Sequence, residues 1–271
     1  MSLKSMGILA GQIAIVTGAG RGFGRAIAKG LAAEGAKVAL VARLRADLDA
    51  VAKDIASAGG HALAMPADVA DRAQVERAVK DAQAAFGPVS LLISCAGVGA
   101  PYGPIGIVDP DAWWRAQEVH LRGPLLLTST LLPGMRERRA GRIVTISAIA
   151  GNRVTPNLSA YGMGKAAQIR LVQHIAAEQK EFGISAFAIE PGTAITDLAE
   201  STIASPDAQR WLPGMVAALR QMRDEKRDAA PVFARCVEMC VGLASGKYDA
   251  LSGRYLEPWD DFDAVLAEAK R

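Results

Sequence analysis

The chain has 271 residues, of which 51% are hydrophobic and 22% are charged, so it is long enough to bury the core of one large domain or two small ones. A formal net charge of +3 is too small to indicate a nucleic-acid-binding protein, and the richest basic run, residues 136–142, contains a glutamate and is expected at a solvated helix end. No apolar run approaches the roughly 18 residues of a membrane span, so we expect no membrane segment.

Cysteine and histidine positions indicate neither disulfides nor a metal site. The three cysteines form no Cys-x-x-Cys pair, which is typical of a reduced intracellular protein, and the three histidines are far apart. The N-terminus lacks a signal-peptide pattern, and we expect a cytoplasmic protein. Residues 1–10 are interpreted as an N-terminal lead, partly an added leader before a second methionine at position 6, and take no part in the fold prediction.

A phosphate-binding loop is predicted close to the N-terminus. Residues 12–17 form a β-branched run typical of a buried parallel strand, four glycines follow between residues 18 and 24, and residues 25–34 carry apolar side chains at helical spacing. Glycines let the backbone approach a pyrophosphate closely, and the free amides at a helix start favour the anion. Strand, glycine loop and helix together predict a dinucleotide site.

The remaining chain alternates between strand and helix patterns. Further strands are predicted over residues 37–42, 61–65, 89–94, 142–147, 184–189 and 253–257. Helices are predicted over residues 46–58, 71–86, 159–182, 232–244 and 261–270, and from Asp109 as N-cap, followed by Pro110, into the 130s. This alternation indicates right-handed βαβ crossovers and a parallel sheet, and because no linker interrupts it, residues 11–271 are predicted to form a single α/β domain.

Two segments of the second half carry further expectations. The helix over residues 159–182 is apolar around most of its circumference, which predicts burial on a second side, either by a second subunit or by loops of the same chain. Residues 193–230 contain prolines and a charged run and are predicted to be irregular. Because they follow the carboxyl end of a strand, they are expected to form a substrate lid, the alternative being a mobile surface insertion.

Tyr161 and Lys165 are four residues apart in the helix over residues 159–182. This spacing places both side chains on one helix face, so a phenol and an ammonium act on the same small volume. The spacing also arises by chance, and the alternative is a half-buried tyrosine beside a solvated lysine.

Five motifs occur in an order that is typical of a known family. They are the glycine loop from Thr17 to Gly24, Asp68-Val69, Ala96-Gly97, the Tyr161 and Lys165 pair, and Pro191-Gly192. With them the chain resembles the short-chain dehydrogenase/reductase family from about residue 11 to residue 257. The resemblance implies a doubly wound Rossmann fold of about seven parallel strands, a nicotinamide cofactor, an alcohol or carbonyl substrate, and a homodimer or homotetramer built on two long helices.

The resemblance also predicts which nicotinamide cofactor binds. In the family the residue just past the second strand selects the cofactor, and here that residue is Ala42, followed by Arg43. Without a carboxylate to repel a 2′-phosphate, and with Arg43 and Arg21 to pair with it, NADP is preferred over NAD; the alternative is two surface arginines without a ligand. Gly20 departs from NADP-using relatives, which often carry serine there.

The family's cofactor contacts are carried over to matching positions of this sequence. Asp68 is expected to accept from the adenine amino group, or alternatively to cap a helix, while Ile195 and Thr196 would fix the carboxamide and the diphosphate. The full predicted set is Gly18, Gly20, Arg21, Gly22, Phe23, Gly24, Arg43, Asp68, Val69, Cys95, Ala96, Gly97, Tyr161, Lys165, Pro191, Gly192, Ile195 and Thr196.

The resemblance implies that Tyr161 is the acid in reduction and the base in oxidation. A free tyrosine has a pKa of about 10, a poor match to neutral pH. We expect the Lys165 ammonium and an oxidised nicotinamide to lower that pKa by favouring the phenolate. Lys165 is also implied to bind the nicotinamide ribose hydroxyls.

Two family positions are occupied by other residues. The family's catalytic serine lies thirteen residues before the tyrosine, where this chain has Ala148; Ser147 is one place too early, and such an offset at a strand end usually reverses the face of the side chain. Loss of an oxyanion donor costs roughly a hundredfold to a thousandfold in rate. His120 replaces an asparagine that helps hold a water between the lysine and solvent, and it either preserves, alters or ends that relay, or is a packed histidine.

Three functions therefore remain open. The favoured one is an NADP-dependent oxidoreductase for a small alcohol or carbonyl compound, in which Tyr161 and Lys165 act with Ser147, a loop polar group or the substrate in the serine role. The others are a cofactor-binding protein with weak or no catalysis, and a lyase or epimerase on the same fold. Trp113, Trp114 and Trp211 are candidates for a pocket wall, or else belong to the core.

Overall fold

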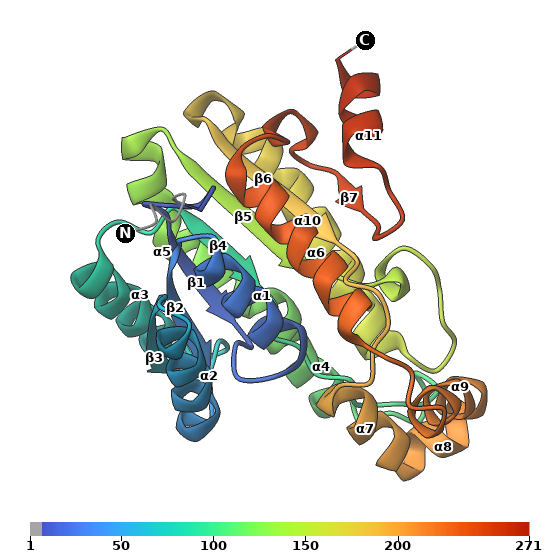
Figure 1. Cartoon of the computed structure of the whole chain (residues 1–271). Helices are drawn as coiled ribbons and strands as arrows, with labels where there is room; N and C mark the ends of the chain where they lie inside the picture. The colour runs from blue at the N-terminus through green and yellow to red at the C-terminus, as the bar shows by residue number, and fades with distance from the viewer. Residues whose placement is uncertain (1–6, 271) are drawn as a thin grey trace.

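The computed structural model describes residues 7–270 and contains a seven-stranded parallel sheet (Figure 1). The strand order is β3-β2-β1-β4-β5-β6-β7, so the direction of winding reverses between β1 and β4. Open α/β sheets bind ligands at the carboxyl ends of the strands where this reversal occurs. The doubly wound, single-domain Rossmann fold is thus confirmed; the predicted lead lies, for residues 1–6, outside the described residues.

The observed elements follow the predicted alternation closely. The strands are β1 Ile13–Thr17, β2 Lys37–Ala42, β3 His61–Pro66, β4 Leu91–Ser94, β5 Gly141–Ile146, β6 Ile184–Ile189 and β7 Tyr255–Leu256. The helices are α1 Gly22–Ala33, α2 Arg45–Ser57, α3 Arg72–Phe86, α4 Pro110–Gln117, α5 Gly123–Arg138, α6 Ser159–Gln179, α7 Asp197–Ala204, α8 Pro206–Trp211, α9 Pro213–Asp224, α10 Ala230–Ser245 and α11 Phe262–Ala269. Within residues 7–270, no helix combines the length and apolar character needed to cross a membrane.

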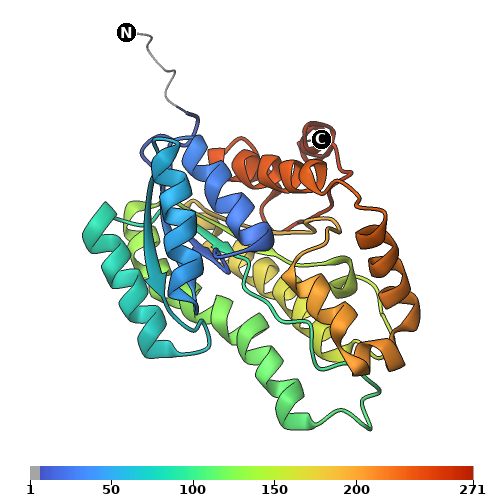
Figure 2. The same cartoon turned by 60° about the horizontal axis from the view of Figure 1, so that its bottom comes forward.

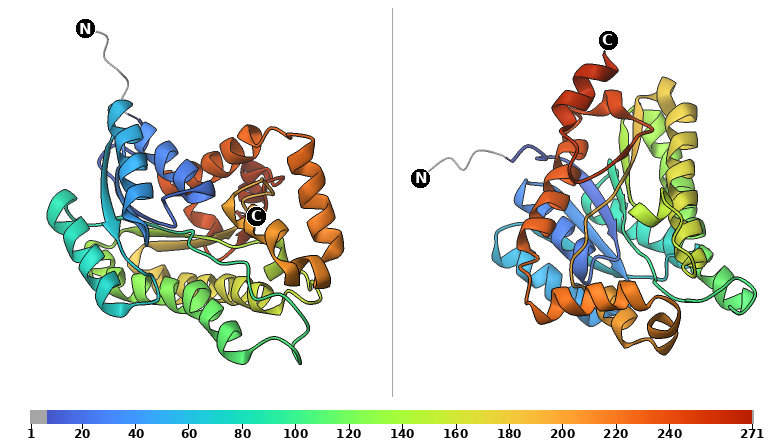
Figure 3. Two further views of the ribbon diagram at one scale, coloured as in Figure 1. Left: turned by 90° about the horizontal axis from the view of Figure 1, so that it is seen from below. Right: turned by 90° about the vertical axis from the view of Figure 1, so that its right-hand side faces the viewer.

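Two helical layers cover the sheet because its central strands are apolar on both faces. Every residue of β1 and of β6 is buried, as expected for parallel strands between helices. Helices α1, α2 and α10 pack on one face through residues such as Leu31 and Leu243, and α3, α5 and α6 pack on the other through residues such as Leu127 and Val172. The left view of Figure 3 shows the strands between these layers.

The predicted long helix that begins after Asp109 is interrupted by a wider turn. Asp109 is the expected N-cap, because its carboxylate accepts from the backbone N–H groups of Asp111 and Ala112. Between α4 and α5, residues Glu118–Arg122 form a π-helical turn, a feature frequent at functional sites. This turn carries His120, which is 0% exposed.

The prediction that residues 193–230 are irregular is wrong, because three helices, α7, α8 and α9, occupy most of this segment. Pro206 and Pro213 are the first residues of α8 and α9, where the missing N–H costs nothing and the fixed φ favours the helix. The Ser205 side chain caps α8 by accepting from the Ala208 N–H. The prolines therefore start helices rather than break them.

Helices α7–α9 lie at one end of the sheet (Figure 3, right view, orange) and have a small apolar cluster of their own. In this cluster Leu212 and Val216 pack with Tyr102 and Leu158, which belong to loops after β4 and β5. Figure 2 shows the loop after β4 running past these helices to the start of α4. The α7–α9 segment is thus fastened to the loops at the carboxyl ends of the strands.

Candidate active site

A cavity of about 810 Å³ opens at the carboxyl ends of the central strands. Its walls come from the loops after β1, β2, β3, β4, β5 and β6 and from helices α1, α2, α6, α7 and α9. It contains every residue predicted to contact a cofactor except Ile195. This is the place at which the strand order reverses, where the fold predicts a ligand.

The glycine loop at one end of the cavity forms a backbone cradle. Gly18 and Gly22 have φ angles of +65° and +54°, which side chains rarely adopt, and a Cβ atom on Gly24 would lie 2.2 Å from the Gly18 carbonyl oxygen. Helix α1 begins at Gly22, and its N-cap residue Arg21 makes no side-chain capping bond. The first-turn N–H groups and the helix dipole therefore face the cavity, which fits a pyrophosphate.

Thr17, the last residue of β1, stabilises the loops beside this cradle. It was not predicted from the sequence as a site residue. Its buried hydroxyl oxygen accepts from the backbone N–H groups of Cys95 (3.0 Å) and Ala96 (3.1 Å). The bond pair ties the end of β1 to the loop after β4. The sequence feature that could have indicated this role is a threonine directly before the first glycine of the loop.

Packing explains why Gly20 differs from the serine of NADP-using relatives. A Cβ atom on Gly20 would lie 2.8 Å from the Cβ of Asp47, in the first turn of α2. A side chain at position 20 therefore requires Asp47 to move. Asp47 also lines the cavity and was missed by sequence, since an acidic residue in a helix's first turn usually serves the helix dipole alone.

The two arginines of the predicted phosphate site have different surroundings. Arg21 lies 3.7 Å from Asp197 at the start of α7, with both side chains more than half exposed, so the glycine loop and α7 meet through this weak ion pair. Arg43 follows β2 and lines the same end of the cavity as Asp47. Arg43 is therefore the arginine better placed to bind a ligand in this part of the cavity.

Asp68 lines the cavity but does not cap the following helix. Its Oδ1 atom accepts from the Ala70 N–H at 2.9 Å, whereas Asp71 is the N-cap of α3 and accepts from the Gln74 N–H. The capping alternative for Asp68 is therefore wrong. Its contact with an adenine stays a prediction.

Tyr161 and Lys165 are held on the first two turns of α6, against the end of β5. Lys165 is 4% exposed and its ammonium donates to the Ile146 carbonyl at 2.7 Å, while its Nζ atom lies 5.5 Å from the centre of the Tyr161 ring. Burial lowers the pKa of Lys165 to about 8. Both side chains line the cavity.

In the protein without cofactor the pKa of Tyr161 is raised, and its expected lowering by Lys165 together with an oxidised nicotinamide stays a prediction. Burial is the largest effect and raises the pKa of Tyr161, and the nearby Cys95, Tyr102 and Glu190 raise it further. Desolvation disfavours the charged phenolate. The phenol consequently keeps its proton at neutral pH.

Ser147 does not offer its hydroxyl to the cavity as a free donor. It is 1% exposed, and its Oγ atom donates to the Lys165 carbonyl at 2.9 Å, so it fastens the end of β5 to α6. Ala148, the next residue, has an extended backbone and lines the cavity. Both residues line the cavity, but the hydroxyl hydrogen of Ser147 is used in the bond to α6 and Ala148 contributes only a methyl group.

His120 is buried behind the cavity wall and does not line it. Its Nε2 atom lies 2.8 Å from the Val98 carbonyl, and burial with the nearby Lys165 lowers its pKa to about 3. The neutral ring therefore donates from Nε2, and its buried Nδ1 has no partner among the described residues. A Cβ atom on Gly97 would lie 3.1 Å from its Cε1 atom, so His120 packs directly beneath the loop after β4.

The predicted tryptophan wall is absent from the cavity lining of the described residues. Trp114 is 63% exposed, Trp113 donates to Ser159, and Trp211 packs on Gly103. The outer wall comes instead from α7 and α9, segments for which no helix was predicted from the sequence.

Across residues 7–270 no group of three or more His, Cys, Asp or Glu side chains is arranged to hold a metal ion.

The fold and the glycine cradle define a dinucleotide-binding α/β protein with a tyrosine and a lysine at the far end of its cavity. The model of the short chain dehydrogenase family matches residues 12–207. The chain belongs to the short-chain dehydrogenase/reductase family, whose members are oxidoreductases that use nicotinamide dinucleotides.

Relatives and solved structures agree with this assignment. A short chain dehydrogenase of Pseudocercospora fijiensis is 34% identical over 277 aligned residues, which cover 99% of this chain and 86% of the relative. A metagenomic short-chain oxidoreductase in complex with NADP is 34% identical, with a TM-score of 0.66 over 69% of this chain and 85% of the other. A gluconate 5-dehydrogenase of Burkholderia cenocepacia in complex with NADP and tartrate is 27% identical, with a TM-score of 0.77 over 92% and 94%.

The lowered pKa of Lys165 predicts that cofactor binding weakens as the pH rises through about 8. The ammonium is present below that pH and lost above it, and the ribose hydroxyls are expected to bind the charged form. The Kd for NADPH, measured by fluorescence titration, should rise roughly tenfold between pH 7 and pH 9, as one pH unit beyond a pKa leaves about a tenth of the group charged.

Lys165→Met is the matched control, because it should bind NADPH weakly with the same Kd at both pH values. A wild-type Kd that stays constant from pH 7 to pH 9 would contradict the role of the charged form.

Proposed function

We propose that the protein is an NADP-dependent oxidoreductase that interconverts a carbonyl compound and a secondary alcohol, with Tyr161 as proton donor and acceptor. The observation that carries the proposal is the placement of Tyr161 and Lys165 side by side in a cavity whose other end is a glycine cradle. One end of the cavity therefore suits the phosphate groups of a cofactor, and the other end suits a reacting carbonyl.

Each part of the site has a role in this reaction. The bound cofactor supplies or takes up the hydride. The amides of the glycine loop hold the diphosphate, and Lys165 binds the nicotinamide ribose. In reduction Tyr161 gives its proton to the carbonyl oxygen, and the ammonium of Lys165 stabilises the phenolate that remains.

Ser147 and His120 act on this chemistry through their neighbours. Ser147 holds the backbone of Lys165, and His120 holds the loop after β4 through Val98. We assign both as positioning residues, since the hydroxyl of the first is engaged and the second lies behind the wall.

The preference for NADP rests on Arg43. It stands at the end of β2 beside the cavity, Ala42 before it carries no charge, and a planar guanidinium suits a phosphate monoester. Two of the similar solved structures contain NADP. The nearby Asp47 opposes this preference in part, so Arg43 is expected to supply most of the discrimination.

Substrate access and assembly complete the proposal. The α7–α9 segment acts as the substrate lid, supported by the residues of α7 and α9 that line the cavity. Leu125 on α5 and Met163 on α6 are 46% and 56% exposed, which supports a homodimer or homotetramer through these two helices. Three free cysteines support a reducing, cytoplasmic setting.

A second candidate function follows from Ala148. With a methyl group at the serine position, the same fold binds NADP with little turnover, as a sensor or scaffold. Tight NADPH binding by calorimetry without NADPH oxidation across a broad carbonyl panel would favour this candidate.

Replacement of the phenol tests the proposed mechanism. Tyr161→Phe should lower NADPH oxidation with a reducible ketone by about 100- to 10,000-fold, the range of a positioned proton donor. The Kd for NADPH should change less than threefold, because the ring and Lys165 remain.

Tyr248→Phe provides the control, since the Tyr248 hydroxyl donates to Asp263 away from the cavity. A Tyr161→Phe enzyme with wild-type turnover would rule out the proposed proton donor.

Charge reversal at Arg43 tests cofactor selection. Arg43→Glu should shift the ratio of kcat/KM for NADPH over NADH toward NADH by about 10- to 100-fold, as a charge-assisted bond to phosphate is lost. Arg45→Glu is the matched control, because Arg45 pairs with Asp49 on the exposed face of α2 and does not line the cavity. An unchanged ratio in Arg43→Glu would show that this arginine does not read the 2′-phosphate.

A further inference from the structure

The half of the cavity beyond the glycine loop is walled mainly by apolar side chains from α7, α9 and the loops after β5. The largest of them are Ile149, Leu158, Leu198, Met215, Leu219 and Met222. Methionines and leucines at this wall offer dispersion contacts and little polarity. The wall therefore suits an apolar substrate body.

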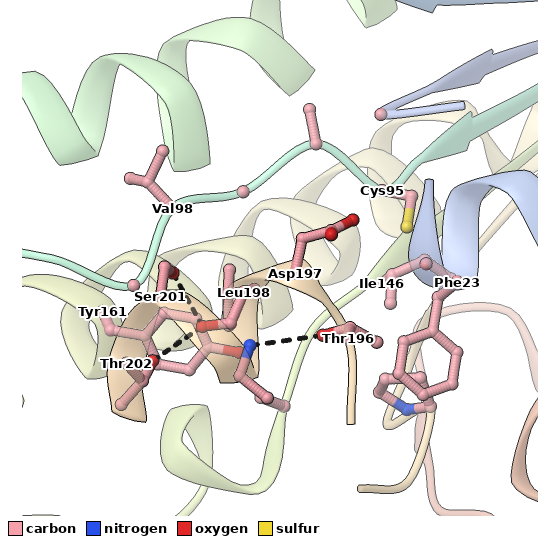
Figure 4. A pocket seen from close by; sticks show the side chains of 18 of the residues that line it. Phe23, Cys95, Val98, Ile146, Tyr161, Thr196, Asp197, Leu198, Ser201 and Thr202 are labelled. Carbon is pink, nitrogen blue, oxygen red and sulfur yellow. Dashed lines mark hydrogen bonds between the residues drawn. The ribbon is translucent and has the colours of Figure 1, made fainter. Parts of the chain in front are cut away.

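Three of the hydroxyl groups on this wall, those of Tyr102, Ser201 and Thr202, use their hydrogens within the protein itself. Ser201 and Thr202 both donate to the Leu198 carbonyl at 2.8 Å, as Figure 4 shows. Because a threonine hydroxyl has one hydrogen, the 2.8 Å contact between Tyr102 and Thr202 makes the Tyr102 hydroxyl the donor. These three hydroxyl groups therefore have no free hydrogen to donate to a substrate.

The two residues that directly follow β5, Ser147 and Ala148, provide no free hydroxyl hydrogen beside Tyr161. Ser147 donates to the Lys165 carbonyl, and Ala148 presents a methyl group to the cavity. Hydride addition places negative charge on the carbonyl oxygen, and each missing oxyanion donor costs roughly a hundredfold to a thousandfold in rate. A substrate whose own structure withdraws charge from that oxygen offsets this loss.

The charges around the cavity disfavour an anionic substrate. Among the described lining residues the cations are Arg21, Arg43 and Lys165; Arg21 pairs with Asp197, Arg43 stands at the end of β2, and the Lys165 ammonium donates to a backbone carbonyl. Glu190 is 6% exposed and also lines the cavity. A carboxylate or phosphate on the substrate would be buried near a carboxyl group without a cation of its own, which is costly.

We propose that the substrate is an uncharged, largely apolar ketone whose carbonyl is activated by an electron-withdrawing neighbour, such as a second carbonyl or an ester. This inference rests on the proposed oxidoreductase function and names its substrate class. The carbonyl carbon takes a hydride from NADPH and the oxygen takes the proton of Tyr161, so the ketone is reduced by two electrons to the alcohol and NADPH is oxidised to NADP⁺.

Three related ketones test charge and activation in the wild-type enzyme. Methyl benzoylformate is activated and uncharged, benzoylformate is its anion, and acetophenone lacks the activating group. The kcat/KM for the methyl ester should exceed that for the anion by about 100-fold, the effect of an unpaired buried charge. Equal values for ester and anion would overturn the requirement for an uncharged substrate.

Ala148→Ser separates enzyme activation from the intrinsic reactivity of the ketone. A hydroxyl restored at this position should raise kcat/KM for acetophenone by about 10- to 100-fold and for methyl benzoylformate less than threefold, because the activated carbonyl needs the second donor least. The two substrates on one variant control for changes in folding or active fraction. An equal increase for both, or no increase for acetophenone, would overturn the inference and leave the oxidoreductase function intact.

Turnover of no ketone by wild-type enzyme that binds NADPH would overturn the oxidoreductase function and the substrate class with it. If Ala148→Ser fails to fold, the wild-type comparison decides: kcat/KM for acetophenone equal to that for methyl benzoylformate would overturn the requirement for activation.

Discussion

The site depends on a reciprocal pair of hydrogen bonds between the end of β5 and helix α6. The Lys165 ammonium donates to the Ile146 carbonyl, and the Ser147 hydroxyl donates to the Lys165 carbonyl. Burial of an ammonium costs free energy, so it persists here only because the strand end supplies its acceptor. These two bonds fix α6 against the sheet and thereby fix Tyr161, one helical turn earlier, at the cavity.

The same buried setting decides the protonation of the site. Lys165 has a lowered pKa and Tyr161 a raised one, and burial is the largest cause of both shifts. At neutral pH the phenol of Tyr161 therefore carries its proton in the protein without cofactor. The opposite end of the cavity needs no titrating group, because backbone amides and the dipole of α1 provide its affinity for phosphate.

Local patterns were sufficient to predict the sheet and the glycine loop that follows its first strand. The strands are continuous β-branched or apolar runs, and the glycines of residues 18–24 follow one of them directly, so spacing alone placed them. The helices of the α7–α9 segment are not evident from sequence because prolines usually break helices, whereas Pro206 and Pro213 each start one here. Thr17 and Asp47 were missed because their roles depend on contacts with distant segments.

Burial was the property that the sequence could not supply. The pKa of Tyr161 depends on how much water reaches the phenol, and in the protein without cofactor burial raises it. His120 and Ser147 have polar side chains near the site in sequence, yet one lies behind the wall and the other is bonded to the helix. Only the structure distinguishes a polar side chain that faces the cavity from one that holds its wall.

The most direct test of the account is the fate of the hydride. NADPH carrying deuterium at both C4 positions should be consumed with an activated ketone, and mass spectrometry of the alcohol should show one deuterium, located on the carbinol carbon. Alcohol without deuterium, or a product formed with no net oxidation of NADPH, would contradict hydride transfer at the Tyr161 and Lys165 site.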